Sequence, residues 1–500
     1  METFYITTPI YYPNAPPHIG HAYTTVFADV IARYRKFMGE ESFLLTGTDE
    51  HGLKLQKIAE KMNVDPKEYV DKMADVFKNY WKTLDISYNY FIRTTDDFHV
   101  EVVKKCILKL YEKGLIYKDR YSGWYCSDCE KFYSERDYVE IDGKPHCPIH
   151  NKPLEWLDEE TYFFKLSVFK DYVMDVLENT DVVYPKQYAI EVLNRLREEG
   201  LKDVSIARRK DRVWWGIELP FDPDYTVYVW FDALLNYVSG IGYLRDNVNF
   251  EKFWRNSYHV IGKDILWFHT VIWFSVLKAL DIPLPKRVIT HAFLLNKGLK
   301  MGKSTGNVIT IEELINRYGE ADPVRYLLVR VFNMDKDVEV SYDIFDSIYT
   351  SELVDNYGNL VRRVGVLAMK KTKGVIYRRT LDKDIEISIN NTIKNYVDAM
   401  DRFETSEALA NVMRLLDKGN SYMNQTKPWE RSSPERELYN VLEIIRVATN
   451  LLNPVMPSIT AQLAKSFGFN IVNYSNLKPV ERYEIKDTPI LFRKIKLKNV

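Results

Sequence analysis

The sequence predicts an α/β protein, with a doubly wound parallel sheet that is split by an insertion and followed by an all-α helix bundle. Three observations predict this architecture. A strand, loop, helix and strand follow one another at the start, the same order returns near residue 258, and helical periodicity dominates after about residue 350. The 500 residues, 46% apolar and 28% charged, suffice for roughly three or four domains.

The first unit of the sheet opens with a short buried strand over residues 4–8, followed by a proline-rich turn. A helix then begins near His18, and Gly39 stops it after its last apolar positions. The next strand covers residues 42–45, so these elements form a parallel βαβ unit. Asp65 is expected to cap a further amphipathic helix.

The second unit has the same order, with a strand over 258–261, a helix over about 264–280 and a strand over 287–290. The segment between the units, roughly 116–224, is turn-rich and then helical around residues 187–199. We therefore expect the insertion to be a separate module.

The helix bundle is expected over residues 353–466, where apolar side chains such as Ala408, Val412 and Leu415 recur at helical spacing. The net charge is −1, so a nucleic-acid partner would have to meet a local basic patch. Residues 362–379 hold seven basic and no acidic side chains, although a solvated helix face would look the same.

The N-terminal start is acidic where a signal peptide would be basic. No apolar run approaches the ~18 residues of a membrane span. These features predict a cytoplasmic protein without a membrane segment.

A phosphate site is indicated by His18-Ile19-Gly20-His21, which starts the first helix directly after the first strand. Backbone N–H groups and the helix dipole favour phosphate there, and two imidazoles can donate hydrogen bonds to an anion. A side chain at Gly20 would stand between the backbone and a nucleotide. The alternative is that both histidines only cap the helix.

A second cationic segment, Lys300-Met301-Gly302-Lys303-Ser304, follows the last strand, and its two lysines can clamp a polyphosphate. The two segments together resemble the HIGH and KMSKS signatures of class I aminoacyl-tRNA synthetases, with Gly302 in place of a serine. This resemblance covers nearly the whole chain. It implies ATP-dependent activation of an amino acid with release of pyrophosphate, followed by transfer to the 3′ end of a tRNA.

The resemblance also implies roles for single residues. Four side chains would be catalytic, two imidazoles on the α-phosphate side and two ammonium groups on the pyrophosphate side: His18, His21, Lys300 and Lys303. Gly262-Lys263-Asp264 matches the ribose-binding segment of the family, although Asp264 could simply cap its helix. The implied ATP-binding residues are His18, Gly20, His21, Gly262, Asp264, Lys300, Lys303 and Ser304. Mg²⁺ is expected to accompany ATP.

Residues 7–12, 47–52, 228–237 and 265–273 resemble the methionine-specific members of the family. They imply L-methionine as the substrate and tRNA(Met) as the partner, with Asp49 binding the substrate ammonium. Aromatic walls suit a polarizable sulfur, although without the family such a cluster is more often core. The side chains implied to enclose the thioether are Ile10, Tyr12, Trp230, Ala233, Leu234, Tyr237, Ile265 and His269.

A metal site is indicated in the insertion, where two ligand pairs occur at zinc spacing. The four ligands would be Cys126, Cys129, Cys147 and His150. They fill a tetrahedral shell, so one structural Zn²⁺ per chain is expected. Unrelated thiols are the alternative, and Cys106 is expected in the core.

The tRNA end is indicated by Asn359 and Arg363, one helical turn apart, which together with Trp429 resemble the anticodon-binding elements of the family. Trp429 offers a flat surface for a splayed base, and a buried bundle tryptophan is the alternative. No dimerising tRNA-binding domain follows the bundle, so a monomer is expected.

The expected domains follow from these segments. Residues 1–115 and 225–291 are the halves of a Rossmann-type catalytic domain, and residues 116–224 are an insertion with a zinc knuckle at about 124–152. Residues 292–350 are a stem-contact region with the KMSKS-like loop, residues 351–480 a helix-bundle anticodon-binding domain, and residues 481–500 a tail.

Three competing interpretations of the function remain. They are another class I synthetase such as the cysteine enzyme, a nucleotidyltransferase of the same superfamily, and a catalytically silent tRNA-binding protein.

Overall fold

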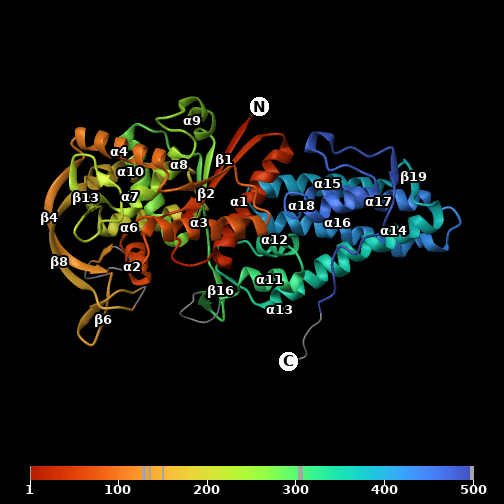
Figure 1. Ribbon diagram of the computed structural model, residues 1–500. Coiled ribbons are helices and arrows are strands. Elements are labelled where there is room, and N and C mark those ends of the chain that lie inside the picture. Colours follow the sequence, from red (N-terminus) through yellow and green to blue (C-terminus); the bar gives the residue numbers. More distant parts are fainter. Residues whose placement is uncertain (1, 127–130, 134–136, 149–150, 302–307, 496–500) are drawn as a thin grey trace.

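The computed structural model describes residues 2–126, 131–133, 137–148, 151–301 and 308–495. These residues form an elongated molecule, with a half that contains the central sheet and a half that consists mainly of helices (Figure 1). Among the helices so described, none combines the length and the apolar character that a membrane crossing requires.

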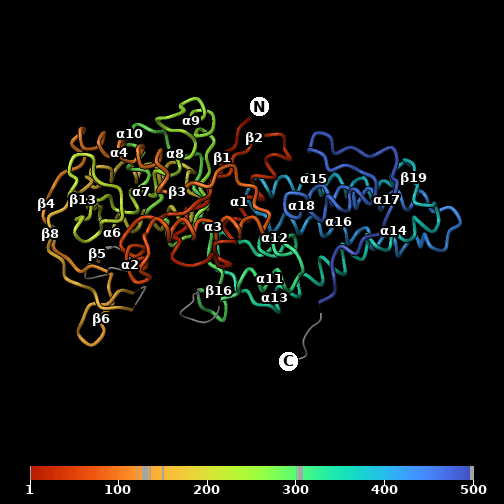
Figure 2. The backbone as a smooth tube through the Cα atoms, viewed as in Figure 1, coloured from red at the N-terminus to blue at the C-terminus, as the bar shows by residue number. Residues whose placement is uncertain are grey.

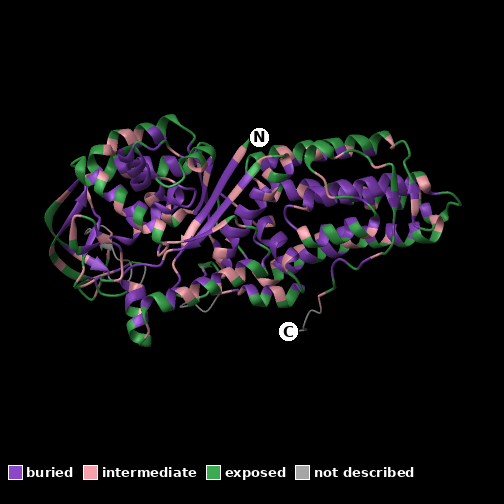
Figure 3. Ribbon diagram, turned by 45° about the horizontal axis from the view of Figure 1, so that its top comes forward, coloured by how far each residue is buried: buried purple, intermediate pink, exposed green. Residues whose placement is uncertain are grey.

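The central sheet consists of β1 (Thr3–Tyr11), β2 (Glu41–Thr48), β3 (Tyr90–Arg93), β9 (Val183–Tyr184), β14 (Ser257–Gly262) and β15 (Arg287–His291). Its order is β3-β2-β1-β14-β15-β9, and every neighbouring pair is parallel. The strands are largely buried (Figure 3). All four strands predicted from the sequence lie in this sheet, so the expected parallel α/β fold is confirmed.

The helices around the sheet are α1 (Ile19–Met38), α2 (Leu53–Met62), α3 (Pro66–Thr83), α4 (Asp97–Glu112), α7 (Val229–Leu234), α8 (Asn236–Ser239), α9 (Asn247–Trp254) and α10 (Trp273–Leu280). Helix α1 ends at Gly39, whose φ of 95° is the left-handed conformation that glycine adopts without strain. The helix predicted over 264–280 is not regular. A 3-10 turn at Lys263–Ile265 and a π turn at Phe268–Ile272 precede α10.

The insertion contains β4 (Ile116–Cys126), β5 (Lys131–Tyr133), β8 (Glu155–Phe164) and β10 (Val204–Ser205) in one antiparallel sheet. It also contains the hairpin β6 (Val139–Ile141) and β7 (Lys144–His146), a small sheet of β11 (Ala207–Arg209), β12 (Glu218–Leu219) and β13 (Asp222–Val227), a 3-10 turn (Leu166–Phe169), α5 (Lys170–Asn179) and α6 (Lys186–Glu199). Strand β9 lies between α5 and α6, yet it pairs with β15 at the edge of the central sheet. The insertion is therefore not self-contained, in contrast to the expectation.

The region after the sheet begins with β16 (Leu294–Asn296), β17 (Leu299–Lys300), α11 (Ile311–Tyr318), α12 (Ala321–Arg330), β18 (Val338–Glu339) and α13 (Tyr342–Ile348). A π-helical stretch (Tyr349–Gly358) joins α13 to the bundle, which comprises α14 (Asn359–Thr372), α15 (Lys383–Asp401), α16 (Thr405–Thr426), α17 (Glu435–Leu452) and α18 (Pro457–Phe467). Short 3-10 turns occupy Pro428–Glu430 and Tyr474–Asn476. The helical C-terminal half is as the periodicity predicts.

The C-terminal segment packs back onto the helices (Figure 2). Strands β19 (Val375–Tyr377) and β20 (Arg482–Glu484) pair antiparallel. Phe492 is buried against Tyr349 and Tyr357, and the Tyr349 hydroxyl donates a hydrogen bond to the carbonyl of Arg493 (2.9 Å). Through residue 495, the expected tail is thus largely an integral part of the fold.

Candidate active site

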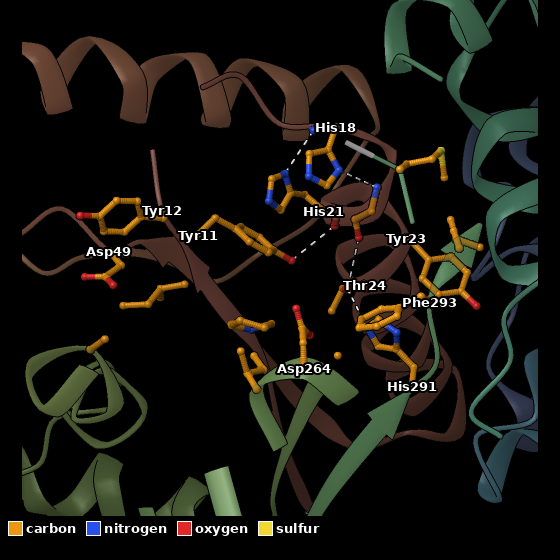
Figure 4. Close-up of a pocket in the computed structure, with 18 of the residues that line it drawn as sticks. Tyr11, Tyr12, His18, His21, Tyr23, Thr24, Asp49, Asp264, His291 and Phe293 are labelled. Carbon is orange, nitrogen blue, oxygen red and sulfur yellow. Dashed lines mark hydrogen bonds between the residues drawn. The ribbon is translucent and has the colours of Figure 1, made fainter. Parts of the chain in front are cut away.

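A cavity of about 570 Å³ opens at the carboxyl ends of the central strands. It is lined by residues from the end of β1, by Asp49 just after β2, by Gly262 at the end of β14 and by His291 at the end of β15. Ligands bind at this edge of a doubly wound sheet because the connecting loops diverge there. In Figure 4 the imidazoles of His18 and His21 lie on one side of the cavity and Asp264 lies on the other.

The two histidines cap the start of α1. Nδ1 of His18 accepts a hydrogen bond from the backbone N–H of Gly20 (3.0 Å), and Nδ1 of His21 accepts one from the backbone N–H of His18 (3.1 Å). Their rings stack with centroids 3.9 Å apart. Because each Nδ1 is an acceptor, a neutral ring carries its proton on Nε2, which is then a donor suited to a phosphate oxygen. The capping interpretation and the phosphate interpretation are therefore compatible.

Two glycines make room for polar side chains of the site. A Cβ at Gly20 would lie 2.8 Å from Cε1 of His18, and a Cβ at Gly262 would lie 2.7 Å from Oδ1 of Asp264. The absence of a side chain at Gly20 thus makes room for the His18 ring. The sequence suggested a different reason, the approach of a nucleotide to the backbone. Asp264 lies inside the 3-10 turn and Gly262 is the N-cap residue, so Asp264 does not act as the helix cap.

One end of the cavity is largely apolar and aromatic. It holds seven of the nine residues predicted for the amino acid, namely Ile10, Tyr12, Asp49, Trp230, Ala233, Leu234 and Ile265. Trp230 stacks on Phe268 with ring centroids 3.9 Å apart, and the Tyr12 hydroxyl donates a hydrogen bond to the carbonyl of His51 (3.1 Å). The backbone N–H of Asp49 donates a hydrogen bond to the carbonyl of Tyr11 (2.9 Å), which fixes the backbone of Asp49 beside the end of β1.

The other two predicted residues, Tyr237 and His269, are not among the cavity-lining residues. Both are buried, and their side chains form a hydrogen bond of 2.7 Å. Nδ1 of His269 lies 2.9 Å from the carbonyl of Ile265 and must donate to it, so Nε2 accepts the proton of the Tyr237 hydroxyl. Burial lowers the pKa of His269 to about 4. This neutral pair supports the wall formed by Trp230, whose ring lies 6.4 Å from that of His269.

The segment around Asp49 is held by two buried carboxylates that bind basic side chains. Glu50, fully buried, binds the guanidinium of Arg93 through both oxygens (2.7 and 2.9 Å). Asp232 binds Nδ1 of His51 (2.7 Å) and Nε2 of His99 (2.8 Å). These contacts join the loop after β2 to β3, α4 and α7, so the backbone of the loop that carries Asp49 is held relative to the apolar wall.

The cavity also contains residues that the sequence reasoning did not identify. Among them are Lys54, Thr24, His291, Phe293 and Met301. Nδ1 of His291 donates to the carbonyl of Ala292 (2.8 Å), and its Nε2 accepts from the hydroxyl of Thr24 (2.9 Å). His291 could have been identified from its position at the end of a strand, and Thr24 from its position about one turn into the helix of the phosphate site.

Two groups of predicted residues lie partly outside the described residues. Lys300 lies in β17, whereas Lys303 and Ser304 lie outside the described residues. Cys129 and His150 also lie outside them. Cys126 and Cys147 are buried in one small cluster with Tyr133 and Leu154, and Sγ of Cys147 donates to the Tyr133 hydroxyl (3.4 Å). Within the described ranges no group of three potential metal ligands is found.

The bundle brings two of the predicted tRNA-binding side chains together. The guanidinium of Arg363 lies 5.9 Å from the ring centroid of Trp429 and donates a hydrogen bond to Oδ1 of Asn424 (2.9 Å). Asn359 is exposed at the start of α14, one turn before Arg363. The Trp429 side chain is 41% exposed, so it is not a core tryptophan. This surface lies at the end of the molecule away from the central sheet (Figure 1).

Two family models match the chain. The family described as "tRNA synthetases class I (M)" matches residues 4–151 and 141–365, and the family described as "Anticodon-binding domain of tRNA ligase" matches residues 382–492. The two matches together cover the sheet, the insertion and nearly all of the bundle.

Similar proteins match over the whole chain. The methionine–tRNA ligase of Caldanaerobacter subterraneus subsp. tengcongensis is 40% identical over 99% of this chain and 79% of the relative, and that of Thermotoga maritima is 39% identical over 99% and 81%. The structure of Mycobacterium tuberculosis methionyl-tRNA synthetase with methionyl-adenylate has a TM-score of 0.92 at 32% identity, and covers 98% of this chain and all of that one. The apo form from the same organism has a TM-score of 0.87 at 29% identity.

Proposed function

The chain belongs to the methionyl-tRNA synthetases of class I and has the activity of a methionine–tRNA ligase, and from this premise we propose how its residues carry out the reaction. The observation that carries the proposal is a single cavity with an apolar, aromatic end beside Asp49 and an end with two capping imidazoles opposite Asp264. These ends suit methionine and ATP respectively.

The first step joins the two substrates. A carboxylate oxygen of methionine attacks the α-phosphorus of ATP, the bond to pyrophosphate breaks, and methionyl-adenylate forms. We propose that Nε2–H groups of His18 and His21 stabilise the charge that grows on the α-phosphate, because their Nδ1 atoms are already engaged in the helix cap. Asp264 would bind the ribose hydroxyls, while Lys300, Lys303 and Ser304 would act on the pyrophosphate side.

Methionine would lie between Asp49 and the wall formed by Ile10, Tyr12, Trp230, Ala233, Leu234 and Ile265. Asp49 would pair with the ammonium, and the aromatic rings would contact the sulfur. Tyr237 and His269 would support this wall from behind, or contact the thioether after a side-chain movement. Mg²⁺ would arrive with ATP and be held mainly by the ATP phosphates. The carboxylates among the described lining residues are those of Asp49 and Asp264, and both are assigned to other groups, the ammonium and the ribose.

Methionine-dependent exchange of labelled pyrophosphate into ATP tests this function without tRNA. We expect exchange with methionine and a background rate with each other amino acid, including cysteine. Exchange driven best by another amino acid would contradict the proposal.

The second step transfers methionine to tRNA(Met), whose 3′-terminal hydroxyl attacks the carbonyl while AMP leaves. We propose that Asn359, Arg363 and Trp429 bind the anticodon and that the basic run over 362–379 meets the phosphate backbone. We propose the same domain limits that the sequence predicts, with one change: β9, although it lies within the insertion, completes the catalytic sheet. That the enzyme is a cytoplasmic monomer stays a prediction.

Replacing Trp429 by alanine should damage aminoacylation and spare methionine activation. Loss of one stacked base costs about 1 to 3 kcal/mol, or roughly 5- to 150-fold in kcat/KM for tRNA. Pyrophosphate exchange and aminoacylation are measured on the same preparation. Tyr474→Ala is the matched control, because Tyr474 is also in the C-terminal half and is 39% exposed. Equal loss of both activities in the Trp429 variant would contradict an anticodon role.

We also propose one structural Zn²⁺ in the insertion. The fit rests on the burial of the Cys126 and Cys147 thiols in one cluster, which is distinct from the main cores and is too small to stabilise this lobe by itself. Cys129 and His150 would complete a tetrahedral shell without an open position. The metal would then fix the shape of the lobe and take no part in the chemistry.

Metal analysis of the purified protein should find about one zinc per chain. Cys126→Ser should lower that content well below one and lower the melting temperature. Cys106→Ser is the matched control, since Cys106 is equally buried in α4 but remote in sequence from the four ligands. Full zinc content in the Cys126 variant, or none in the unmodified protein, would exclude the site.

A further inference from the structure

A fully buried arginine lies where the two halves of the molecule meet. Arg325, in α12, is 0% exposed. Its Nη2 donates to Oδ2 of Asp29 (2.6 Å) and to the carbonyl of Pro454 (3.1 Å), and its Nε donates to the carbonyl of Val455 (2.8 Å). Its Nη1 donates to the carbonyls of Leu84 (3.1 Å) and Asp85 (3.2 Å). Each nitrogen of the guanidinium is therefore engaged, and the geometry is rigid.

These partners come from structurally distinct places. Asp29 lies in the middle of α1, the helix whose first turn carries the two capping histidines. Pro454 and Val455 form the corner between α17 and α18, and α17 packs against α14 and α16. Helices α14 and α16 carry Arg363 and Asn424, so the corner belongs to the same helix assembly as the proposed anticodon surface. Arg325 thus joins that assembly to the helix of the phosphate site.

Helix α1 is suited to transmit a displacement. His21 and Asp29 are eight residues apart, which is about 12 Å along a helix. The Asp29 carboxylate is itself held, because Oδ1 accepts the backbone N–H of Ser87 (2.8 Å) and Oδ2 also accepts Nε of Arg33 (2.8 Å). The last turns of α1 contact the bundle directly, since the Tyr34 hydroxyl donates to Oδ1 of Asp401 (3.0 Å). A packed helix moves as a unit, so a shift at Asp29 reaches the imidazoles.

We propose that Arg325 is a positioning residue that couples anticodon binding to the reacting groups, by holding the α17–α18 corner to Asp29 of α1. The inference rests on the proposed function of both ends. It assigns Arg325 no contact with substrate. When tRNA binds the far end of the bundle, the corner and α1 shift together, and the change in α1 alters the transfer step rather than the affinity for tRNA.

Arg325→Lys tests the coupling. Lysine keeps the charge opposite Asp29 but lacks the planar fork that reaches both the Asp29 carboxylate and the carbonyls of Pro454 and Val455. The matched control is Arg330→Lys in the same helix, because Arg330 binds Glu352 and Ser406, which both lie in the C-terminal half. Methionine-dependent pyrophosphate exchange is measured first, then kcat and KM for aminoacylation of tRNA(Met) and of a transcript with an altered anticodon.

In the unmodified enzyme and in Arg330→Lys, the altered anticodon should lower kcat by about 5- to 150-fold, the usual range of coupling between two sites. In Arg325→Lys, exchange should persist and kcat should become nearly independent of the anticodon, while the effect on KM for tRNA remains. A full anticodon effect on kcat in Arg325→Lys would overturn the inference alone. Absence of methionine-dependent exchange in the unmodified enzyme would instead overturn the proposed function.

If Arg325→Lys does not fold, Asp29→Asn breaks the same link from the other side and retains a neutral acceptor. The same measurements apply. An unchanged anticodon effect on kcat in the folded Asp29→Asn enzyme would likewise overturn the inference, and so would equal loss of exchange and transfer in either variant, because a merely structural role lowers both.

Discussion

Replacing His21 by asparagine is expected to slow methionine activation by about 10²- to 10³-fold, the usual effect of removing one preorganised donor to a developing charge. The asparagine oxygen lies about where Nδ1 lies in histidine, so it can still accept the backbone N–H of His18. The substitution therefore removes the Nε2–H donor and keeps the helix cap. Pyrophosphate exchange and thermal unfolding are measured together.

His21→Gln is the matched control for that experiment. The glutamine amide nitrogen lies about where Nε2 lies, so a donor remains near the phosphate, but the cap acceptor is lost. Loss of a cap costs about 0.5 to 2 kcal/mol. We expect the glutamine enzyme to be more active and less stable than the asparagine enzyme. An asparagine enzyme within a few-fold of the unmodified rate would show that His21 only caps the helix.

Replacing Asp49 by asparagine is expected to weaken methionine binding strongly. Removing one partner of a buried, hydrogen-bonded charge pair costs about 2 to 5 kcal/mol, which is about 30-fold or more in the Michaelis constant for methionine. The Michaelis constant for ATP should change little, because the two imidazoles lie at another part of the cavity.

The binding of a methionine analogue without the amino group isolates this effect. Asp49→Asn should not weaken its binding, since the analogue offers no ammonium. Glu60→Gln is the matched control, because it removes one carboxylate charge from an exposed position on α2. Equal loss of affinity for methionine and for the analogue would mean that Asp49 shapes the cavity without binding the ammonium.

Much of the fold could be predicted because its strands and helices are bounded by proline, glycine and acidic caps. The exceptions have physical reasons. Strand β9 has only two residues, Val183 and Tyr184, which is too short to show a pattern. The π turn at Phe268–Ile272 keeps helical hydrophobic spacing, so periodicity cannot reveal it.

The candidate site was predictable where a motif fixes the local backbone, as at His18 and His21. The direction of a side chain depends on tertiary packing, so the sequence could not separate the lining residue Trp230 from Tyr237 and His269 behind it. His291 and Thr24 belong to none of the quoted motifs and meet only because β15 and α1 are neighbours. The whole-length match to methionine enzymes decides between the competing classes.

The order of the central strands has a consequence for synthesis of the chain. β1 lies inside the sheet, but its neighbour β14 follows far along the chain, as the 252 residues between Thr7 and His259 show. At about 5 to 20 residues per second, translation leaves that edge of β1 unpaired for roughly 13 to 50 s. An open edge can template wrong strand pairing. That edge of β1 can be paired correctly only after β14 (Ser257–Gly262) has been synthesised and has left the ribosome.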